Sequence, residues 1–496
     1  MDPSLPTGVS RPSGWIIVGA SGLGLASAYW DDSWHSTLGR DSALIPPHLL
    51  LYASIVAVGV ILGLWAMRIL RDTRSLSALG RAPGFILAAA SAAATAIAAP
   101  ADAFWHSTFG RDAVLWSPPH LLSVISTTVL LGAMLVSVSD RPWRQLQIGL
   151  SAVVLAAAQI LVMEYDTDVP QFSETLYLPV ALLSLLSAGW VIIRTTRFPF
   201  ALTTAIVAYI LLRAALTAGL TGAGWLAPDL PLALLGLAAV DLLQSLPRLR
   251  WLVAASIVAA LESLLSAIRL SNVQIGSILP WTMAVVGAAL VAVFVVGVRN
   301  RAVTATIVLL LGLSFALVTP VPASAHDPGQ GPSFGTAALS VQGDGSGELT
   351  VTVDDFSTTA TMPGRAWLVA RRAGQTITVP LAAGSVSRSG RATGRISLPH
   401  PGLWFVYADV SSYVGTLEVW LPISQNFTGT ITQTRALYQP TETREWSPPQ
   451  YLFALSLVAI GAVLVVWLMV RVRRVPTSGA TERPYTSGAP PSLPGR

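Results

Sequence analysis

Apolar segments of membrane-spanning length are the feature that most constrains this chain. A helix that crosses a bilayer needs roughly 20 apolar residues. Segments of about this length recur eleven times before residue 322, and one more follows near the C-terminal end. The sequence therefore predicts a polytopic α-helical membrane protein with about twelve transmembrane helices. The expected spans are residues 14–30, 48–69, 84–104, 119–138, 146–164, 177–195, 199–219, 230–246, 250–268, 277–298, 303–321 and 451–471.

Arginine placement orients these spans, because the cytoplasmic loops of membrane proteins are enriched in basic residues. Loops with an excess of Arg, such as residues 68–81 and 141–144, alternate with loops in which acidic residues outnumber Arg, such as residues 31–41 and 102–112. The composition is rich in Ala and uses Arg as its basic residue, which is typical of bacteria. We therefore predict a multi-pass protein of a bacterial inner membrane, in contact with membrane lipid, with both termini cytoplasmic. The net charge of +5 comes from these loops and does not indicate nucleic-acid binding.

A soluble region separates the last two spans. It contains five runs of alternating polar and apolar residues, with Gly- or Pro-containing turns between them, which favours a β-sandwich. These runs are residues 347–356, 365–371, 375–381, 402–410 and 415–421. The expected organisation is a duplicated helix-pair region at 1–140, further transmembrane helices at 141–322, an extracytoplasmic β-sandwich at 324–447, a C-terminal transmembrane helix at 448–474 and a disordered, Pro-, Ser- and Gly-rich cytoplasmic tail at 475–496.

An internal repeat carries the chemistry. Residues 31–50 and 102–122 share nine of their first fourteen positions, and both end in Pro-Pro-His-Leu-Leu. Each copy covers the exit of one helix and the entrance of the next. An Asp and a His four residues apart share one face of a helix, and the His after Pro-Pro lies in the first turn of the returning helix. Each copy thus offers one carboxylate and two imidazoles, a metal-binding set with open positions. The expected ligands are Asp31, His35, His48, Asp102, His106 and His120.

Other repeated residues are suited to support those ligands. An acidic residue can accept a hydrogen bond from a ligand imidazole, and an Arg can pair with a carboxylate. The expected supporting residues are Arg40, Asp41, Arg111 and Asp112. The alternative is that the repeated His and Asp residues are ordinary interface residues left by a duplication. The chain has no Cys, which excludes thiolate sites, but the spacing leaves copper, iron and zinc open.

The pattern Asp-x3-His-x12-His, followed by Asp-x3-His-x13-His, resembles the C subunit of the copper membrane monooxygenases, which include the particulate methane and ammonia monooxygenases. The resemblance covers roughly residues 14–140. It implies copper at both motifs. The second motif of that family often begins with Asn, whereas this chain has Asp102.

A further candidate ligand is His326. The segment before it resembles a signal peptide with a small-residue cleavage site, and cleavage after Ala325 would place His326 at a new N-terminus. A terminal His can bind copper through its amine and its ring, as in periplasmic copper carriers and the B subunit of the monooxygenases, which this region resembles. The alternative is a small-residue linker with a solvated His326. We interpret His400, which precedes Pro401, as a turn residue.

Three functions follow as hypotheses. The first is an oxygen-activating, monooxygenase-like copper enzyme acting on a small apolar substrate. The second is copper acquisition or delivery without catalysis, and the third is a structural membrane protein without metal. A homo-oligomer or additional subunits are compatible with each.

Two groups of ionisable residues lie outside the repeat. Arg213, Asp241 and Glu262 lie within three successive expected spans. They are suited to a proton or ion path, but we predict instead that Arg213 and Glu262 pair and hold helices together. The acidic run at 164–174 is suited to collecting cations, although such runs are usually solvated surfaces.

Overall fold

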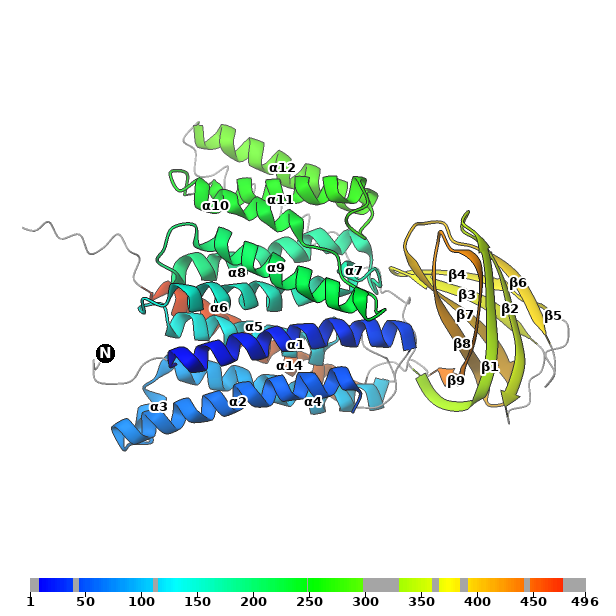
Figure 1. The fold of residues 1–496 in the computed structure, drawn as a ribbon, viewed down its shortest axis with the longest axis horizontal. Coiled ribbons are helices and arrows are strands. Elements are labelled where there is room, and N and C mark those ends of the chain that lie inside the picture. Colours follow the sequence, from blue (N-terminus) through cyan, green and yellow to red (C-terminus); the bar gives the residue numbers. More distant parts are fainter. Residues whose placement is uncertain are drawn as a thin grey trace, which may run out of the picture.

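The computed structural model describes residues 9–38, 44–109, 115–247, 249–297, 330–358, 365–383, 391–440 and 447–475. They form a bundle of helices and a separate antiparallel β-domain at one end of it (Figure 1). The helices are α1 (Arg11–Leu38), α2 (Pro46–Thr73), α3 (Ser77–Gly80), α4 (Pro83–Phe109), α5 (Pro118–Ser137), α6 (Arg144–Gln159), α7 (Met163–Asp166), α8 (Tyr177–Thr195), α9 (Ala201–Gly222), α10 (Ala238–Leu242), α11 (Arg250–Ala267), α12 (Ile275–Gly297) and α14 (Pro448–Arg473), with short 3-10 helices at Ile160–Val162, Glu174–Leu176 and Leu232–Leu237.

Eight helices among the described residues are long and apolar enough to cross a membrane. This confirms a helical membrane part and leaves the full count of twelve as a prediction. Expected span 14–30 lies in α1, which is long but less apolar, and spans 230–246 and 277–298 correspond to shorter apolar helices. Expected span 303–321 lies outside the described residues.

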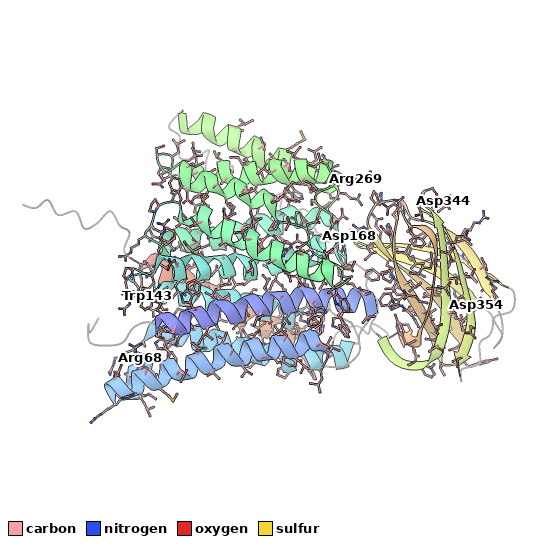
Figure 2. All side chains as sticks on the ribbon, viewed as in Figure 1. Arg68, Trp143, Asp168, Arg269, Asp344 and Asp354 are labelled. Atoms are coloured by element: carbon pink, nitrogen blue, oxygen red, sulfur yellow. The ribbon has the colours of Figure 1, made fainter. Side chains whose placement is uncertain are left out.

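The most enclosed helical segment runs from α6 through α7. It is 78% buried, against 22% for α2 at the edge of the bundle. Near-continuous apolar sequence on all sides of a helix is typical of a central position, because every face needs an apolar neighbour. Arg68 and Trp143 lie at the end of the bundle away from the β-domain, whereas Asp168, just after α7, lies at the end that faces it (Figure 2).

The β-domain is one antiparallel sheet of nine strands. In spatial order they are β4 (Gln375–Pro380), β3 (Ala366–Arg372), β7 (Leu403–Ser412), β8 (Gly415–Ser424), β9 (Thr428–Pro440), β1 (Gln330–Asp344), β2 (Glu348–Thr358), β6 (Ala392–Ser397) and β5 (Ala382–Ala383). Strand β6 also packs against β3 and β4, so the sheet curls until it is nearly closed. The five alternating runs correspond to β2, β3, β4, β7 and β8, which confirms an antiparallel β-domain; its division into the two sheets of a sandwich stays a prediction.

Strands β7 and β8 are apolar on both faces. Trp404 and Val406 of β7 point into the core of the β-domain, whereas Tyr407 belongs to a smaller buried cluster on the other face, with Trp420 of β8. Tyr407 and Trp420 are only 2% and 3% exposed. Because successive side chains of a strand point to opposite faces, burial of both faces requires a cover on each side. The helices provide the second cover: β3, β7 and β8 form the side of the β-domain nearest the bundle (Figure 1).

Candidate metal centre

The first Asp/His/His set converges where α1 ends and α2 begins. Helix α1 continues through Leu38, so Asp31 and His35 lie one turn apart on the same face. Helix α2 begins with two prolines after the extended residue Ile45, which places His48 in its first turn. The two helices pack against each other, so His48 returns to the Asp31 face.

The ligand atoms of this set are close together. Asp31 Oδ1 lies 3.4 Å from His35 Nε2 and 3.0 Å from His48 Nε2. One donor atom from each of the three residues lies within 4.8 Å of the other two. The two imidazole rings have centroids 5.8 Å apart. Three donors at these separations can contact a single ion at the 2.0–2.2 Å distances usual for nitrogen and carboxylate ligands.

The carboxylate of Asp31 is suited to a cation. Its Oδ1 atom is buried and lies between the imidazole nitrogens of His35 and His48. Burial alone would raise the pKa of Asp31, but its contacts with His35 and His48 outweigh burial and lower the pKa to about 2. The carboxylate therefore stays charged, and a charged oxygen beside two imidazole nitrogens is a suitable ligand set for a cation.

The second set is arranged similarly in the part that the structure describes. Asp102 lies in α4 and His120 in the first turn of α5, and Asp102 Oδ1 is 3.1 Å from His120 Nε2. Ser117 caps α5 by accepting a hydrogen bond from the backbone N–H of His120. His106 belongs to α4, but its side chain lies outside the described residues. Two of the three expected ligands are therefore brought together.

The first set and the two described residues of the second set, Asp102 and His120, line one cavity of about 430 Å³. Much of its wall is apolar and comes from α1, α2, α4, α5 and α6. The β-domain contributes Phe405, Tyr407 and Trp420, which we call the aromatic cluster. The polar residues of the lining include Asp31, Asp32, His35, His48, Tyr52, Asp102, His120 and Glu164. The two motifs thus face a common space.

Two carboxyl groups of this cavity were not predicted as site residues. Asp32 accepts a hydrogen bond of 2.5 Å from Thr167 Oγ1, and burial raises its pKa to about 7 despite that bond. Glu164 accepts a 2.8 Å hydrogen bond from the backbone N–H of Leu115. Asp32 directly follows the proposed ligand Asp31 in the sequence, and this adjacency could have identified it as a site residue. Glu164 is 3% exposed, so the interpretation of its acidic run as a solvated surface is wrong.

The predicted pairing of Arg213 with Glu262 is also wrong. Arg213 forms its ion pair with Asp166 and lies over the ring of Tyr29, 4.0 Å from the ring centroid. Glu262 instead accepts a hydrogen bond from Ser271.

Several predicted site residues cannot be placed. The supporting residues Arg40, Asp41, Arg111 and Asp112, and the candidate ligand His326, lie outside the described residues. His400 lies just before β7, and its backbone carbonyl accepts a hydrogen bond from Trp404 Nε1.

No protein-family model matches this chain, and no curated protein shows significant similarity to it.

Proposed function

We propose that this chain is a membrane protein that binds copper at two Asp/His/His sites facing a shared cavity. The observation that carries the proposal is the convergence of Asp31, His35 and His48, with a buried carboxylate oxygen between two imidazole nitrogens. Asp102, His106 and His120 form the second site of the proposal. His326 is a further copper ligand if the chain is cleaved after Ala325.

The donor chemistry favours copper among the open alternatives. Two imidazoles and one carboxylate suit copper, iron or zinc, but divalent copper binds most tightly to a given nitrogen and oxygen set. Bound copper would supply one-electron redox chemistry and open coordination positions. The chain's own residues would hold the ion, and the apolar wall would admit a small apolar molecule or dioxygen while excluding bulk water.

An enzyme of the monooxygenase type is the first form of this proposal. In this form the protein is an enzyme of a bacterial inner membrane, with twelve transmembrane helices, cytoplasmic termini and an extracytoplasmic β-sandwich. Copper delivery without catalysis is the second form. The contribution of Phe405, Tyr407 and Trp420 to the cavity favours it, because a soluble domain over a metal site is suited to handing over an ion.

Metal analysis of the purified protein tests the proposal. We expect copper in the wild-type protein and its loss from a His35→Ala/His106→Ala variant that still folds. Metal-free wild-type protein after exposure to copper would favour the structural alternative, and iron or zinc in place of copper would overturn the choice of metal.

Two further measurements separate the two forms. Oxygen uptake that depends on a small hydrocarbon or on ammonia would support the enzyme. A copper-accumulation defect in a deletion strain, without any lost oxidation, would support delivery.

A further inference from the structure

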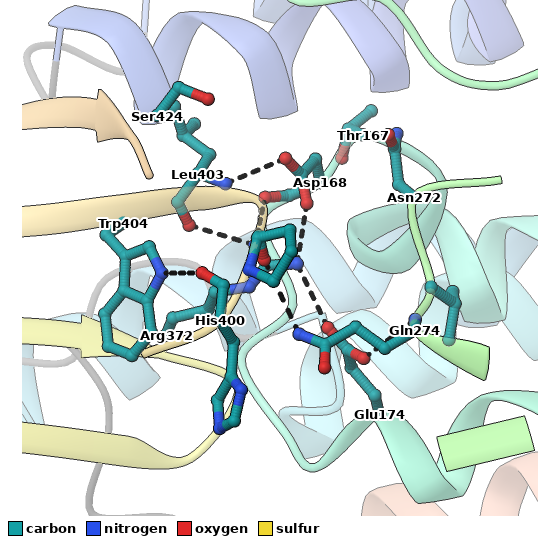
Figure 3. Close-up of polar contacts among 12 residues, drawn as sticks. Thr167, Asp168, Glu174, Asn272, Gln274, Arg372, His400, Leu403, Trp404 and Ser424 are labelled. Atoms are coloured by element: carbon teal, nitrogen blue, oxygen red, sulfur yellow. Dashed lines mark hydrogen bonds and ion pairs between the residues drawn. The ribbon is translucent and has the colours of Figure 1, made fainter. Parts of the chain in front are cut away.

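A buried arginine joins the β-domain to the helical bundle close to the metal cavity. Arg372, the last residue of β3, is 4% exposed. Its Nη2 atom lies 2.7 Å from Asp168 Oδ1 and 3.0 Å from Glu174 Oε1, both in the segment between α7 and α8. Its Nη1 atom donates to the carbonyls of Asp168 and Leu403, at 3.0 Å and 2.9 Å. Figure 3 shows these contacts converging on the guanidinium group.

The same contacts determine where β7 begins. The backbone N–H of Leu403 donates to Asp168 Oδ2 at 2.8 Å, so both backbone groups of this residue are held by the Arg372 network, which consists of Arg372, Asp168, Glu174 and Leu403. Phe405 and Tyr407 follow two and four residues later on β7, on the face that lines the cavity. The Arg372 network therefore sets the position of the aromatic cluster.

A second arginine fixes the other side of that cluster. Arg435 of β9 lies over the ring of Trp420, 4.7 Å from its centroid, and donates a hydrogen bond of 2.5 Å to the carbonyl of Thr37. Thr37 lies in the last turn of α1, two residues beyond His35. A cation is favourable at that end of a helix, where backbone carbonyls lack helical partners.

We propose that the entrance to the metal cavity lies between the β-domain and the helices, that the aromatic cluster closes it, and that Arg372 is the positioning residue that keeps it closed. This inference concerns access to the proposed metal sites and rests on the proposed function for its biological meaning. The entering species is a hydrated cation or another small polar solute, because this route opens to water. A route through the bilayer, between helices, would not depend on Arg372.

Thiol labelling tests the route without any metal. The chain has no Cys, so a single Ser123→Cys substitution places one reactive group on the cavity wall, one turn from His120. A charged, water-soluble thiol reagent should label this group slowly in the full-length protein. Adding Arg372→Met should speed labelling at least about tenfold, because breaking a buried ion pair costs more than a tenfold change requires. Arg372→Lys should give an intermediate rate, and Arg395→Met, an exposed arginine of β6, should leave it unchanged.

A disulfide lock between the β-domain and the bundle should have the opposite effect and slow labelling. Misfolding would speed labelling, so it cannot produce this result. The backbone N–H of Ala373 donates to the carbonyl of Pro170 at 3.0 Å, which brings the two residues close enough for a Pro170→Cys/Ala373→Cys bridge. With Ser123→Cys present, the oxidised lock should slow labelling at position 123 several-fold. Reduction should restore the rate at that position, measured by peptide mass analysis because it also frees the two thiols of the lock.

Two outcomes would overturn the proposal: equal labelling rates in the unlocked, locked and Arg372→Met proteins, or labelling by an uncharged, lipid-soluble reagent that is fast in all three. Either result leaves the copper proposal standing, because copper content is measured separately. Conversely, a chain that binds no copper but shows these labelling rates keeps the entrance and loses the metal function.

Discussion

Asp31 Oδ1 and His48 Nε2 lie 3.0 Å apart although Asp31 belongs to α1 and His48 to α2. This contact closes the metal set across two helices, since Asp31 and His35 are already neighbours on one helix. The set therefore depends on the packing of α2 against α1.

Replacing His48 should abolish tight metal binding at the first site. We expect His48→Ala to lower its copper affinity by more than about 100-fold, because loss of outer partners alone costs 10- to 100-fold. Copper content after dialysis against a chelator should fall to that of the second site. His400→Ala is the matched control, because His400 does not line the cavity. Unchanged copper content in the His48 variant would remove this residue from the ligand set.

Removing the buried charge of Arg213 should destabilise the bundle. Arg213 is fully buried, pairs with Asp166 and also donates to the carbonyl of Asp229 at 3.1 Å. Arg213→Met leaves Asp166 without its cation, which costs about 3–5 kcal/mol. We expect a lower thermal melting temperature, with partial recovery in Arg213→Met/Asp166→Asn. A single variant that melts like the wild type would mean that the pair does not support the bundle.

The helical membrane part and the shared helix face of Asp31 and His35 were predictable because each depends on local periodicity. Spans follow from apolar length, and Asp31 and His35 follow from helical spacing. The partner of Arg213 was not predictable, because a buried cation selects its carboxylate by tertiary position. Asp166 and Glu262 are both buried acidic residues, and only their positions in the folded bundle decide that Asp166 pairs with Arg213.

The sequence of β7 already indicated that the aromatic cluster is covered on its outer face. Residues 402–410 read GLWFVYADV, which is apolar at both alternating sets of positions. A strand with one solvated face normally alternates, so this run indicated a second cover over Phe405 and Tyr407. What the pattern did not contain is the identity of that cover, because strand periodicity carries no information about a distant helix.

Gly402 should be required for the Arg372 network. Its φ angle is +113°, and a Cβ atom there would lie 2.3 Å from Arg372 Cζ. Gly402→Ala therefore adds a steric overlap with a buried guanidinium to the backbone strain. Gly429→Ala is a close control, because Gly429 has φ +99° but open space around it. Overpacking typically costs about 1–3 kcal/mol, so we expect Gly402→Ala to melt at a lower temperature than Gly429→Ala. Equal melting temperatures would show that Arg372 can move aside without cost.

Asp409 should make the stability of the β-domain depend on pH. Burial raises its pKa from 3.8 to about 6, and the charge of Arg371 on β3, which pairs with Glu418, only partly opposes this. Glu418 lies directly opposite Asp409 on β8 and adds a second carboxylate. The folded pKa is higher than the unfolded one, so stability is fully present below about pH 4 and is lost as pH rises through about 6.

Asp409→Asn imitates the protonated group and should therefore stabilise the protein at pH 7.5 but not at pH 4. A shift of about two pKa units corresponds to about 3 kcal/mol, which is the upper limit of the gain. Melting temperatures at the two pH values measure it. Asp344→Asn is the control of opposite sign, because hydrogen bonds from Ser346 lower the pKa of this exposed carboxyl. That substitution should give no gain at pH 7.5. If Asp409→Asn instead stabilises equally at both pH values, the effect comes from packing and the carboxyl of Asp409 is not the group that titrates.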